Sequence, residues 1–396
     1  MFSQEQIAQI QKAINRDRLI DTAVALINVP SPTCDAGRVA NRLADILTTD
    51  GFVVERPSAN WPSAPAVVVR LSSGKPGRTL QLDGHLDTVH LPFVPASVKD
   101  GILRGSGASD MKGGVAACIE VLRVLRETGA LLHGSVLFTA HDHHEGPWGD
   151  KRQVVGLIEA GYVGDAVLFP EYLSDRLPLA GRGMAIFEVT VTRDGTPVHE
   201  VLCEKNLPDV LGTGVEVVSR LKVLGKQLSA VSKPYAGHDS VFVGQFHAGE
   251  IYNQVTNVCR LHGTRRWVIP GQTHDVQAEF ESLMQTVAKE SSTQIKTQFD
   301  VQGDAFSVAE DDPVVMAFQM AHQTITGQVL PFGDKPFVDD GNGYAALAHV
   351  PVLTHGPNAR GAHTTDEWVP VDELVRVAQV YALTALAFCR SSSASI

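Results

Sequence analysis

Long hydrophobic runs, paired cysteines and clusters of basic residues are all scarce in this chain of 396 residues. No run approaches the roughly 18 consecutive apolar residues that suggest a membrane-spanning helix, so none is predicted. The N-terminal segment has no apolar stretch before its first charges, which argues against a secretory signal. The five cysteines are scattered and form no CxxC pair, so we expect them to be reduced in a cytoplasmic protein.

Positive charge is in deficit, because 33 Lys and Arg face 44 Asp and Glu, a formal net charge of −11. An acidic chain without a basic cluster is a poor candidate for binding nucleic acid or an anionic membrane surface. The surplus carboxylates either cover a solvated face or concentrate in a cation site. With 44% apolar residues, the chain can bury an ample core in two or three domains.

Alternating strand and helix patterns predict an α/β catalytic domain. In residues 1–178, strand-like runs such as Thr79–Leu82 and Ser135–Thr139 alternate with helical periods such as Gly113–Thr128. This alternation is typical of a mixed, mostly parallel sheet covered by helices. Two prolines within residues 30–32 interrupt the first helical stretch, so we expect two helices there.

The pattern changes near Leu177. Residues 179–295 show strands and helices in the order β-α-β-β-α-β, which is typical of a compact α+β domain. Residues 296–396 return to the α/β pattern and close on a helix over Val371–Cys389. We therefore predict one catalytic domain, in two parts, interrupted by an inserted α+β domain.

Residues suited to a metal follow two predicted strands. The strand Thr79–Leu82 runs into His85 and Asp87, at the strand end where open α/β sheets gather their ligands. The Asp can fix the tautomer of the His, although this pair also occurs in ordinary loops. The strand Ser135–Thr139 ends in five consecutive His, Asp or Glu residues, from His141 to Glu145. A divalent cation would give such a row a common partner; a solvated loop is the alternative.

Three further residues extend this pattern. Asp110 closes a glycine-rich turn before a helix, Glu171 follows a short apolar strand, and His363 follows the strand that ends at Thr354. The glycine-rich turn lacks the GxxxxGK[ST] order of a phosphate loop, and an Asp would repel an anion there. The convergence of these segments, rather than any one of them, predicts a metal site.

Together these segments resemble the metallopeptidase family of glutamate carboxypeptidase, acetylornithine deacetylase, succinyl-diaminopimelate desuccinylase and aminoacylase. The matching motifs are GHLDTV, GSGASDMKGG, PE at Glu171, GPN and AHTTDEW. They occur in the family's order and cover nearly the whole chain. The resemblance implies a zinc-peptidase-like catalytic domain and a small-molecule substrate.

The resemblance also implies two divalent cations, usually zinc, with manganese or cobalt as alternatives; because this chain lacks one glutamate of the family, we expect one or two to bind. By resemblance, Asp110 bridges the two cations, His85 and Glu171 complete one site, and His363 belongs to the other. Asp87 is expected to contact His85 and orient its ring without binding a cation itself. The peptide bond between Asp110 and Met111 is expected to be cis.

The inserted domain carries further matches to the family. The resemblance implies that this domain forms the interface of a homodimer or higher homo-oligomer. His199 would then reach the active site of the partner chain and stabilise the developing oxyanion. The matching substrate-binding positions are Asn253, Arg266, Gly356 and Asn358.

The chain departs from the family after the strand Ser135–Thr139. The family has two adjacent glutamates there, a general base followed by a metal ligand, whereas this chain has one glutamate. Counting from different landmarks puts Asp142 and His143, His143 and His144, or His144 and Glu145 in those positions. We favour His144 as the ligand and Glu145 as the general base, because imidazole binds zinc well and a carboxylate is the better base beside a cation.

These observations favour a metal-dependent hydrolase that cleaves the C–N amide bond of a small carboxylate-bearing substrate with a metal-activated water. One alternative is an aminohydrolase that releases ammonia from an activated substrate, for example an aromatic one. Another is a non-catalytic binding protein with the same fold. The presence of all four expected metal ligands argues against it, because a protein without catalytic activity has no need to keep His85, Asp110, Glu171 and His363. The products separate the two reactions, since one yields an acid and an amine and the other yields ammonia.

Overall fold

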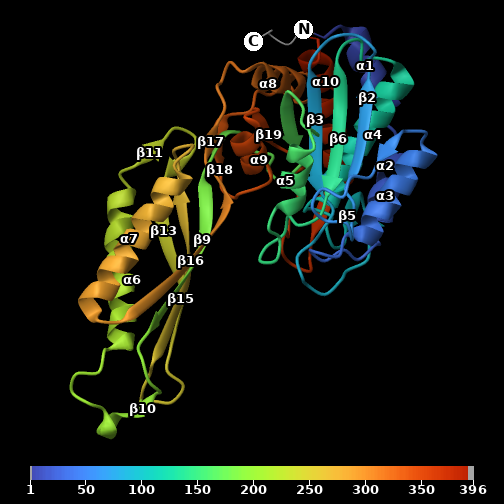
Figure 1. Ribbon diagram of the computed structural model, residues 1–396. Coiled ribbons are helices and arrows are strands. Elements are labelled where there is room, and N and C mark those ends of the chain that lie inside the picture. Colours follow the sequence, from blue (N-terminus) through green and yellow to red (C-terminus); the bar gives the residue numbers. More distant parts are fainter. Residues whose placement is uncertain (1, 391–396) are drawn as a thin grey trace. The chain divides into compact units, whose positions relative to one another are not determined.

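The computed structural model describes residues 2–390, which form two compact units (Figure 1). The first unit comprises the chain through Leu179, Val308–Gly333 and the part from Asp339 onward, and the second comprises Ala180–Ser307 and Asp334–Val338. The sequence predicts an inserted domain over 179–295. The second unit extends further, because β16 (Gln294–Gly303) pairs along the length of β9 (Gly183–Thr192).

A six-stranded mixed sheet in the order β1-β2-β6-β3-β7-β19 forms the centre of the first unit. The strands are β1 (Val54–Glu55), β2 (Val67–Ser72), β6 (Ser135–His141), β3 (Thr79–His85), β7 (Ala166–Phe169) and β19 (Val352–Thr354). Strands β6, β3, β7 and β19 run parallel, whereas β2 is antiparallel to both of its neighbours. The expected mostly parallel sheet is confirmed, and its four parallel strands end at the same edge.

Helices surround this sheet. They are α1 (Gln4–Ala13), α2 (Arg16–Ile27), α3 (Gly37–Thr49), α4 (Lys112–Thr128), α5 (Arg152–Glu159), α8 (Pro313–Thr326), α9 (Gly341–Gly343), a π-helical turn (Tyr344–Ala348) and α10 (Val371–Phe388). Helix α4 is buried along most of its length and packs against α2 and α10. Across the described part of the chain, no helix is long and apolar enough to cross a membrane.

The N-terminal helical stretch forms three helices instead of the expected two. Asn15 separates α1 from α2, because its side-chain oxygen accepts a hydrogen bond from the backbone N–H of Arg18 and so caps the start of α2. An apolar period continues across this cap, which is why periodicity alone does not reveal the break.

The remaining strands of the first unit lie near the glycine-rich turn. A small antiparallel sheet joins β20 (Trp368–Pro370), β5 (Ile102–Arg104) and β4 (Ser97–Lys99). The pairing of Trp368 with Arg104 brings the residues before β20 beside those after β5. Three short strands lie where the chain passes between the two units: β8 (Leu177–Gly181), β17 (Phe306–Ser307) and β18 (Phe332–Lys335).

The second unit is a four-stranded antiparallel sheet in the order β13-β15-β9-β16, with α6 and α7 on one face (Figure 1). Its other main elements are β13 (Ser240–Ala248), β15 (Val258–Trp267), α6 (Val210–Leu228) and α7 (Thr273–Ser291), and its short ones are β10 (Val198–His199), a 3-10 turn (Glu200–Leu202), β11 (Ser232–Lys233), β12 (Gly237–His238) and β14 (Gln254–Val255). Alternate residues of β9, including Phe187 and Val189, pack against Leu221 of α6 and Phe280 of α7. The chain order is the predicted β-α-β-β-α-β.

Candidate active site

The ends of three adjacent parallel strands meet at one edge of the main sheet. His85 is the last residue of β3, His144 follows the end of β6 by three residues, and Glu171 follows the end of β7 by two. Because β6 and β7 flank β3, these side chains converge. His85, His144 and Glu171 each offer a ligand atom within 4.8 Å of the other two.

The carboxylate of Asp110 lies between two imidazoles. Its Oδ1 atom is 3.0 Å from Nε2 of His85, and its Oδ2 atom is 3.3 Å from Nε2 of His363. Oε2 of Glu145 lies 3.1 Å from the same nitrogen of His363. One oxygen of Asp110 therefore faces each imidazole, which is the arrangement that a carboxylate shared by two cations would need.

The donors of this cluster fit divalent cations. The carboxylates of Asp110, Glu145 and Glu171 are all buried, and Oε2 of Glu171 finds no hydrogen-bond partner among residues 2–390. Burial and the nearby charge of Asp110 raise the pKa of the Glu171 carboxyl well above its usual range. Buried carboxylates are costly without a compensating positive charge. Imidazole nitrogens and carboxylate oxygens are a donor set that zinc and manganese accept.

The neighbouring carboxylates favour the protonated form of two imidazoles of the cluster. Burial by itself would lower the pKa of His85, but the hydrogen bond with Asp110 and the charges of Asp87 and Glu145 outweigh it and raise the pKa well above the usual value. Hydrogen bonds with Asp110 and Glu145 raise the pKa of His363 to about 10. Because metal-bound imidazole must give up this proton, cation binding at the cluster should release protons.

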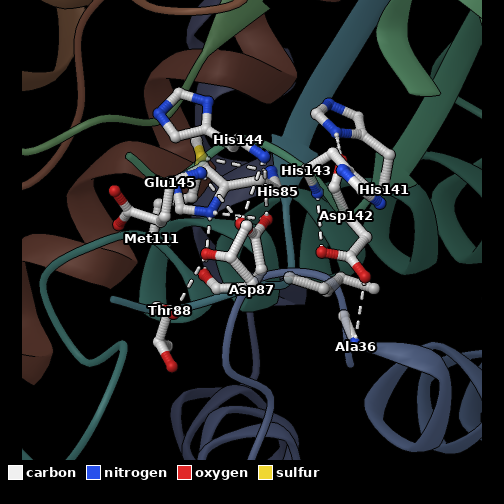
Figure 2. A network of polar contacts seen from close by, with 12 residues as sticks. Ala36, His85, Asp87, Thr88, Met111, His141, Asp142, His143, His144 and Glu145 are labelled. Carbon is white, nitrogen blue, oxygen red and sulfur yellow. Dashed lines mark hydrogen bonds and ion pairs between the residues drawn. The ribbon is translucent and has the colours of Figure 1, made fainter. Parts of the chain in front are cut away.

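Asp87 ties the loop after β6 to the end of β3 (Figure 2). Its Oδ2 atom accepts hydrogen bonds from the backbone N–H groups of His144, at 3.1 Å, and Glu145, at 2.9 Å. Its Oδ1 atom is 3.6 Å from Nδ1 of His85, and that nitrogen also contacts the backbone oxygen of Asp87 at 2.9 Å. One residue thus orients His85 and sets the position of the His144-Glu145 pair.

Asp142 and His143 point away from the cluster. The Asp142 carboxylate accepts hydrogen bonds from the backbone N–H groups of Cys34 and Ala36, both at 3.0 Å, just before α3 (Figure 2). The ring of His143 packs edge-on against Trp61, and its Nδ1 lies 3.2 Å from Asp150. Of the three pairs left open by counting residues, His144 and Glu145 are the pair that the structure brings to His85 and Asp110.

Glu367 is a residue of the site that the sequence analysis missed. Its carboxylate accepts hydrogen bonds from the backbone N–H groups of Gly107, Ser109 and Asp110, at 3.1 to 3.2 Å, and from the hydroxyl of Ser109 at 3.0 Å. It therefore holds the turn that aims Asp110. The peptide bond from Asp110 to Met111 is cis, as the resemblance implies. Glu367 belongs to the AHTTDEW motif, but nothing in the motif reveals its partners.

Asp340 is a second missed residue, and it contacts His144 directly. It lies just before α9, and its Oδ2 atom is 2.6 Å from Nδ1 of His144. Asp339 and Asp340 are followed by Gly341 and Gly343, a composition typical of an ordinary turn, so the sequence alone does not single out Asp340. Burial opposes ionisation of Asp340, but its neighbours His144 and Lys151 hold the pKa of its carboxyl well below the usual range.

The two predicted substrate residues near β19 differ in their surroundings. Gly356 packs on the strand end that carries Glu171, and a Cβ atom there would lie 2.1 Å from the Glu171 backbone oxygen. A side chain at 356 would thus push the ends of β19 and β7 apart. Asn358 is exposed, and its backbone N–H donates to Oε2 of Glu373 at 2.8 Å.

Three predicted site residues lie in the second unit: His199 and Asn253 contact each other, and Arg266 lies apart from them on β15. The side-chain amide nitrogen of Asn253 lies 3.0 Å from Nε2 of His199, where β14 pairs with β10. Arg266 lies on β15, where burial and the neighbouring Arg182 lower the pKa of its guanidinium.

Activation of water for hydrolysis is the chemistry that this donor set supports, so the fold and the cluster define a metal-dependent hydrolase. Residues 81–387 match peptidase family M20/M25/M40, and the chain belongs to that family. The family inferred from the motifs is thereby confirmed, and with it the class of hydrolases that act on carbon–nitrogen bonds.

Several known proteins are similar to the chain over nearly its whole length. The N-formyl-4-amino-5-aminomethyl-2-methylpyrimidine deformylase of Bacillus subtilis is 24% identical, covering 97% of this chain and 98% of the relative. The succinyl-diaminopimelate desuccinylase of Gluconacetobacter diazotrophicus is 26% identical, covering 90% and 93%. The crystal structure of a tripeptidase from Staphylococcus aureus has the same fold, with a TM-score of 0.80, 21% identity and coverage of 96% and 100%.

The role of Glu367 leads to a first prediction. Glu367→Gln keeps the size of the side chain but replaces one acceptor oxygen by a donor that faces backbone N–H groups. We expect the free energy of unfolding to fall by about 1–3 kcal/mol, since buried N–H groups lose their partner. The affinity of the cluster for a divalent cation should fall as well, because the turn no longer aims Asp110. Chemical denaturation and zinc titration of the same samples measure the two effects. The neighbouring Asp366→Asn, at an exposed ion pair with Arg104, should change neither; equal losses in both variants would argue against the clamp.

Proposed function

We propose that the protein hydrolyses an amide bond of a small carboxylate-bearing molecule and releases an acid and an amine. The observation that carries this proposal is the Asp110 carboxylate, with one oxygen toward His85 and the other toward His363. Two of the relatives described above are named for the removal of formyl and succinyl groups. Both names describe cleavage of an acyl group from nitrogen.

The cluster would hold one or two divalent cations, with zinc, manganese and cobalt as candidates. His85, His144 and Glu171 would hold the first, His363 would hold the second, and Asp110 would be shared. When bound, such cations lower the pKa of a coordinated water and polarise the carbonyl of the substrate. Asp87 keeps His85 and the His144-Glu145 pair in place through its hydrogen bonds.

Glu145 would move the proton. Its buried carboxylate faces His363, close to Asp110. From there it would take a proton from the attacking water and return it to the leaving nitrogen, which must depart as a neutral amine. The same position would also suit a metal ligand, so the role of Glu145 is tested separately below.

Residues of the second unit would recognise the substrate. Arg266 offers a guanidinium that can bind a carboxylate through two parallel hydrogen bonds. Asn253 and His199, which contact each other, offer donors for the polar groups of the substrate and for a developing oxyanion. Gly356 and Asn358 would contribute the backbone beside Glu171.

The second unit would also form a homodimer interface. Strand β13 is at the edge of its sheet, and Phe242 on β13 and Val215 on α6 are more than half exposed. Together with Val218, Val241 and Phe246 they line an apolar groove. A second copy of this edge would bury the groove and pair the free strand. We further propose a cytoplasmic location, since all five cysteines are free thiols, as a reducing compartment would keep them.

Removal of the cation provides the first test of the proposed function. We expect dialysis against a chelator to abolish hydrolysis of N-acylated amino acids and short peptides, and zinc, manganese or cobalt to restore it. Asp110→Asn should lose bound metal and turnover together, because one carboxylate serves both cations. The exposed Asp372→Asn is the control and should keep both. Full activity of the metal-free protein, or ammonia as the released product, would contradict the proposal.

Two neighbouring substitutions separate the base from the ligand. Glu145→Gln should lower kcat by about 10²–10⁴-fold, the usual range for a general acid–base, with metal content unchanged. His144→Ala should lose metal first. Elemental analysis and steady-state kinetics on the same preparations distinguish these outcomes. Loss of metal from Glu145→Gln would instead make Glu145 a ligand and leave proton transfer to His144.

The dimer can be tested by complementation. His199→Ala should reduce turnover but keep the metal, whereas Asp110→Asn keeps a normal His199. If His199 serves the active site of the partner chain, mixed dimers of the two variants should be more active than either variant alone. Absence of recovery in mixed dimers that have been purified with two different tags would show that His199 does not act across the interface.

A further inference from the structure

A second group of buried titratable side chains lies behind the active site. Asp83, His141 and Asp340 each place a possible ligand atom within 4.8 Å of the others. Nε2 of His141 is 2.9 Å from Oδ1 of Asp83, whose other oxygen accepts hydrogen bonds from the hydroxyls of Thr139 and Tyr344. Protein groups therefore satisfy Asp83 and His141 without an ion. Asp340 is the member of this group that reaches the active site.

Asp340 is held in a fixed position. Its backbone oxygen accepts hydrogen bonds from Gly343 and Tyr344, at 2.9 and 3.2 Å, in the turn that starts α9. Its Oδ1 atom lies 3.2 Å from Nζ of Lys151. Lys151 also donates to the backbone oxygen of His144 at 2.8 Å. Lys151 thus fixes both the carboxylate and the loop that carries the imidazole facing it.

The contact with Asp340 decides which nitrogen of His144 faces the cluster. A carboxylate only accepts hydrogen bonds, so Nδ1 of His144, at 2.6 Å from Asp340, must carry the proton. The opposite nitrogen, Nε2, lies 3.9 Å from Oε1 of Glu171, and the ring stacks parallel to His85 at 3.9 Å. The ring therefore points an available lone pair toward His85 and Glu171.

We propose that Asp340 is a positioning residue, which fixes the Nδ1–H tautomer and the direction of His144 so that Nε2 is presented to the cation site. The inference rests on the proposed function in taking His144 as a metal ligand. The family has a glutamate where this chain has His144. Here the negative charge is carried by Asp340, which contacts the far side of the His144 ring instead of contacting the cation. Carboxylates behind ligating imidazoles both orient the ring and make it more basic.

Zinc affinity gives the first test. Metal-free protein is titrated with zinc against a chelating dye for the wild type, Asp340→Asn, Asp83→Asn and His144→Gln. We expect Asp340→Asn to bind zinc 10–100-fold more weakly, the range for such outer partners. Asp83→Asn disturbs the same buried group but leaves the contact with His144, so it should retain near wild-type affinity. Thermal unfolding of each variant shows that the compared samples are folded.

A spectroscopic test does not depend on any Asp340 variant folding. In the cobalt-loaded protein, each coordinated imidazole with a protonated second nitrogen gives a shifted, exchangeable N–H proton signal. We expect one such signal to vanish in His144→Gln and, in the wild type, to exchange slowly with water because Asp340 accepts it.

The outcomes separate the two proposals. Wild-type zinc affinity in Asp340→Asn, an equal loss in Asp83→Asn, or a rapidly exchanging His144 proton in the wild type would overturn the positioning role of Asp340 and leave the proposed function intact. Wild-type affinity in His144→Gln would overturn both the ligand role of His144 and the inference. A protein that binds no cation at all would overturn the proposed function itself.

Discussion

The active site depends on one buried carboxylate that faces two imidazoles. Asp110 directs one oxygen to His85 and the other to His363, and both contacts are short. Burying a charged carboxylate costs free energy unless positive charge lies close to its oxygens. The rest of the site meets this requirement: the end of β3 supplies His85, Glu367 holds the turn that aims Asp110, and Glu145 and Glu171 add the further negative charge that divalent cations require.

This chain has His144 and Glu145 where the family has two glutamates. The site therefore has one negative charge fewer, but both positions still offer an atom that can bind a metal. His144 occupies a place beside His85 and Glu171, and Glu145 occupies one beside His363. Asp87 keeps both in register by accepting their backbone N–H groups. An imidazole brings no negative charge of its own, but its contact with Asp340 places a carboxylate directly behind it. The site can therefore keep both positions filled by possible metal donors although one glutamate of the family is replaced.

Much of this arrangement follows from local sequence. The sheet, the β-α-β-β-α-β order and the approach of His85 and Glu171 follow from strand periodicity and from the rule that parallel strands end at one edge. Other features depend on contacts between distant segments. Glu367 meets Asp110 across 257 residues and Asp340 meets His144 across 196, through loops that carry no periodic pattern. The N-terminal break at Asn15 depends on a single cap, and a shift of one residue in the loop after β6 would exchange His144 for His143.

Asp110 is expected to be the carboxylate at which divalent cations bind. The most direct measurement is anomalous X-ray scattering, at the zinc absorption edge, from crystals of the wild-type protein soaked in zinc. The account predicts an anomalous peak beside Asp110 in contact with His85 and Glu171 and, if a second cation binds, another beside Asp110 and His363. An ordered site without a peak beside Asp110, or zinc held instead by Asp142 and His143, would contradict it.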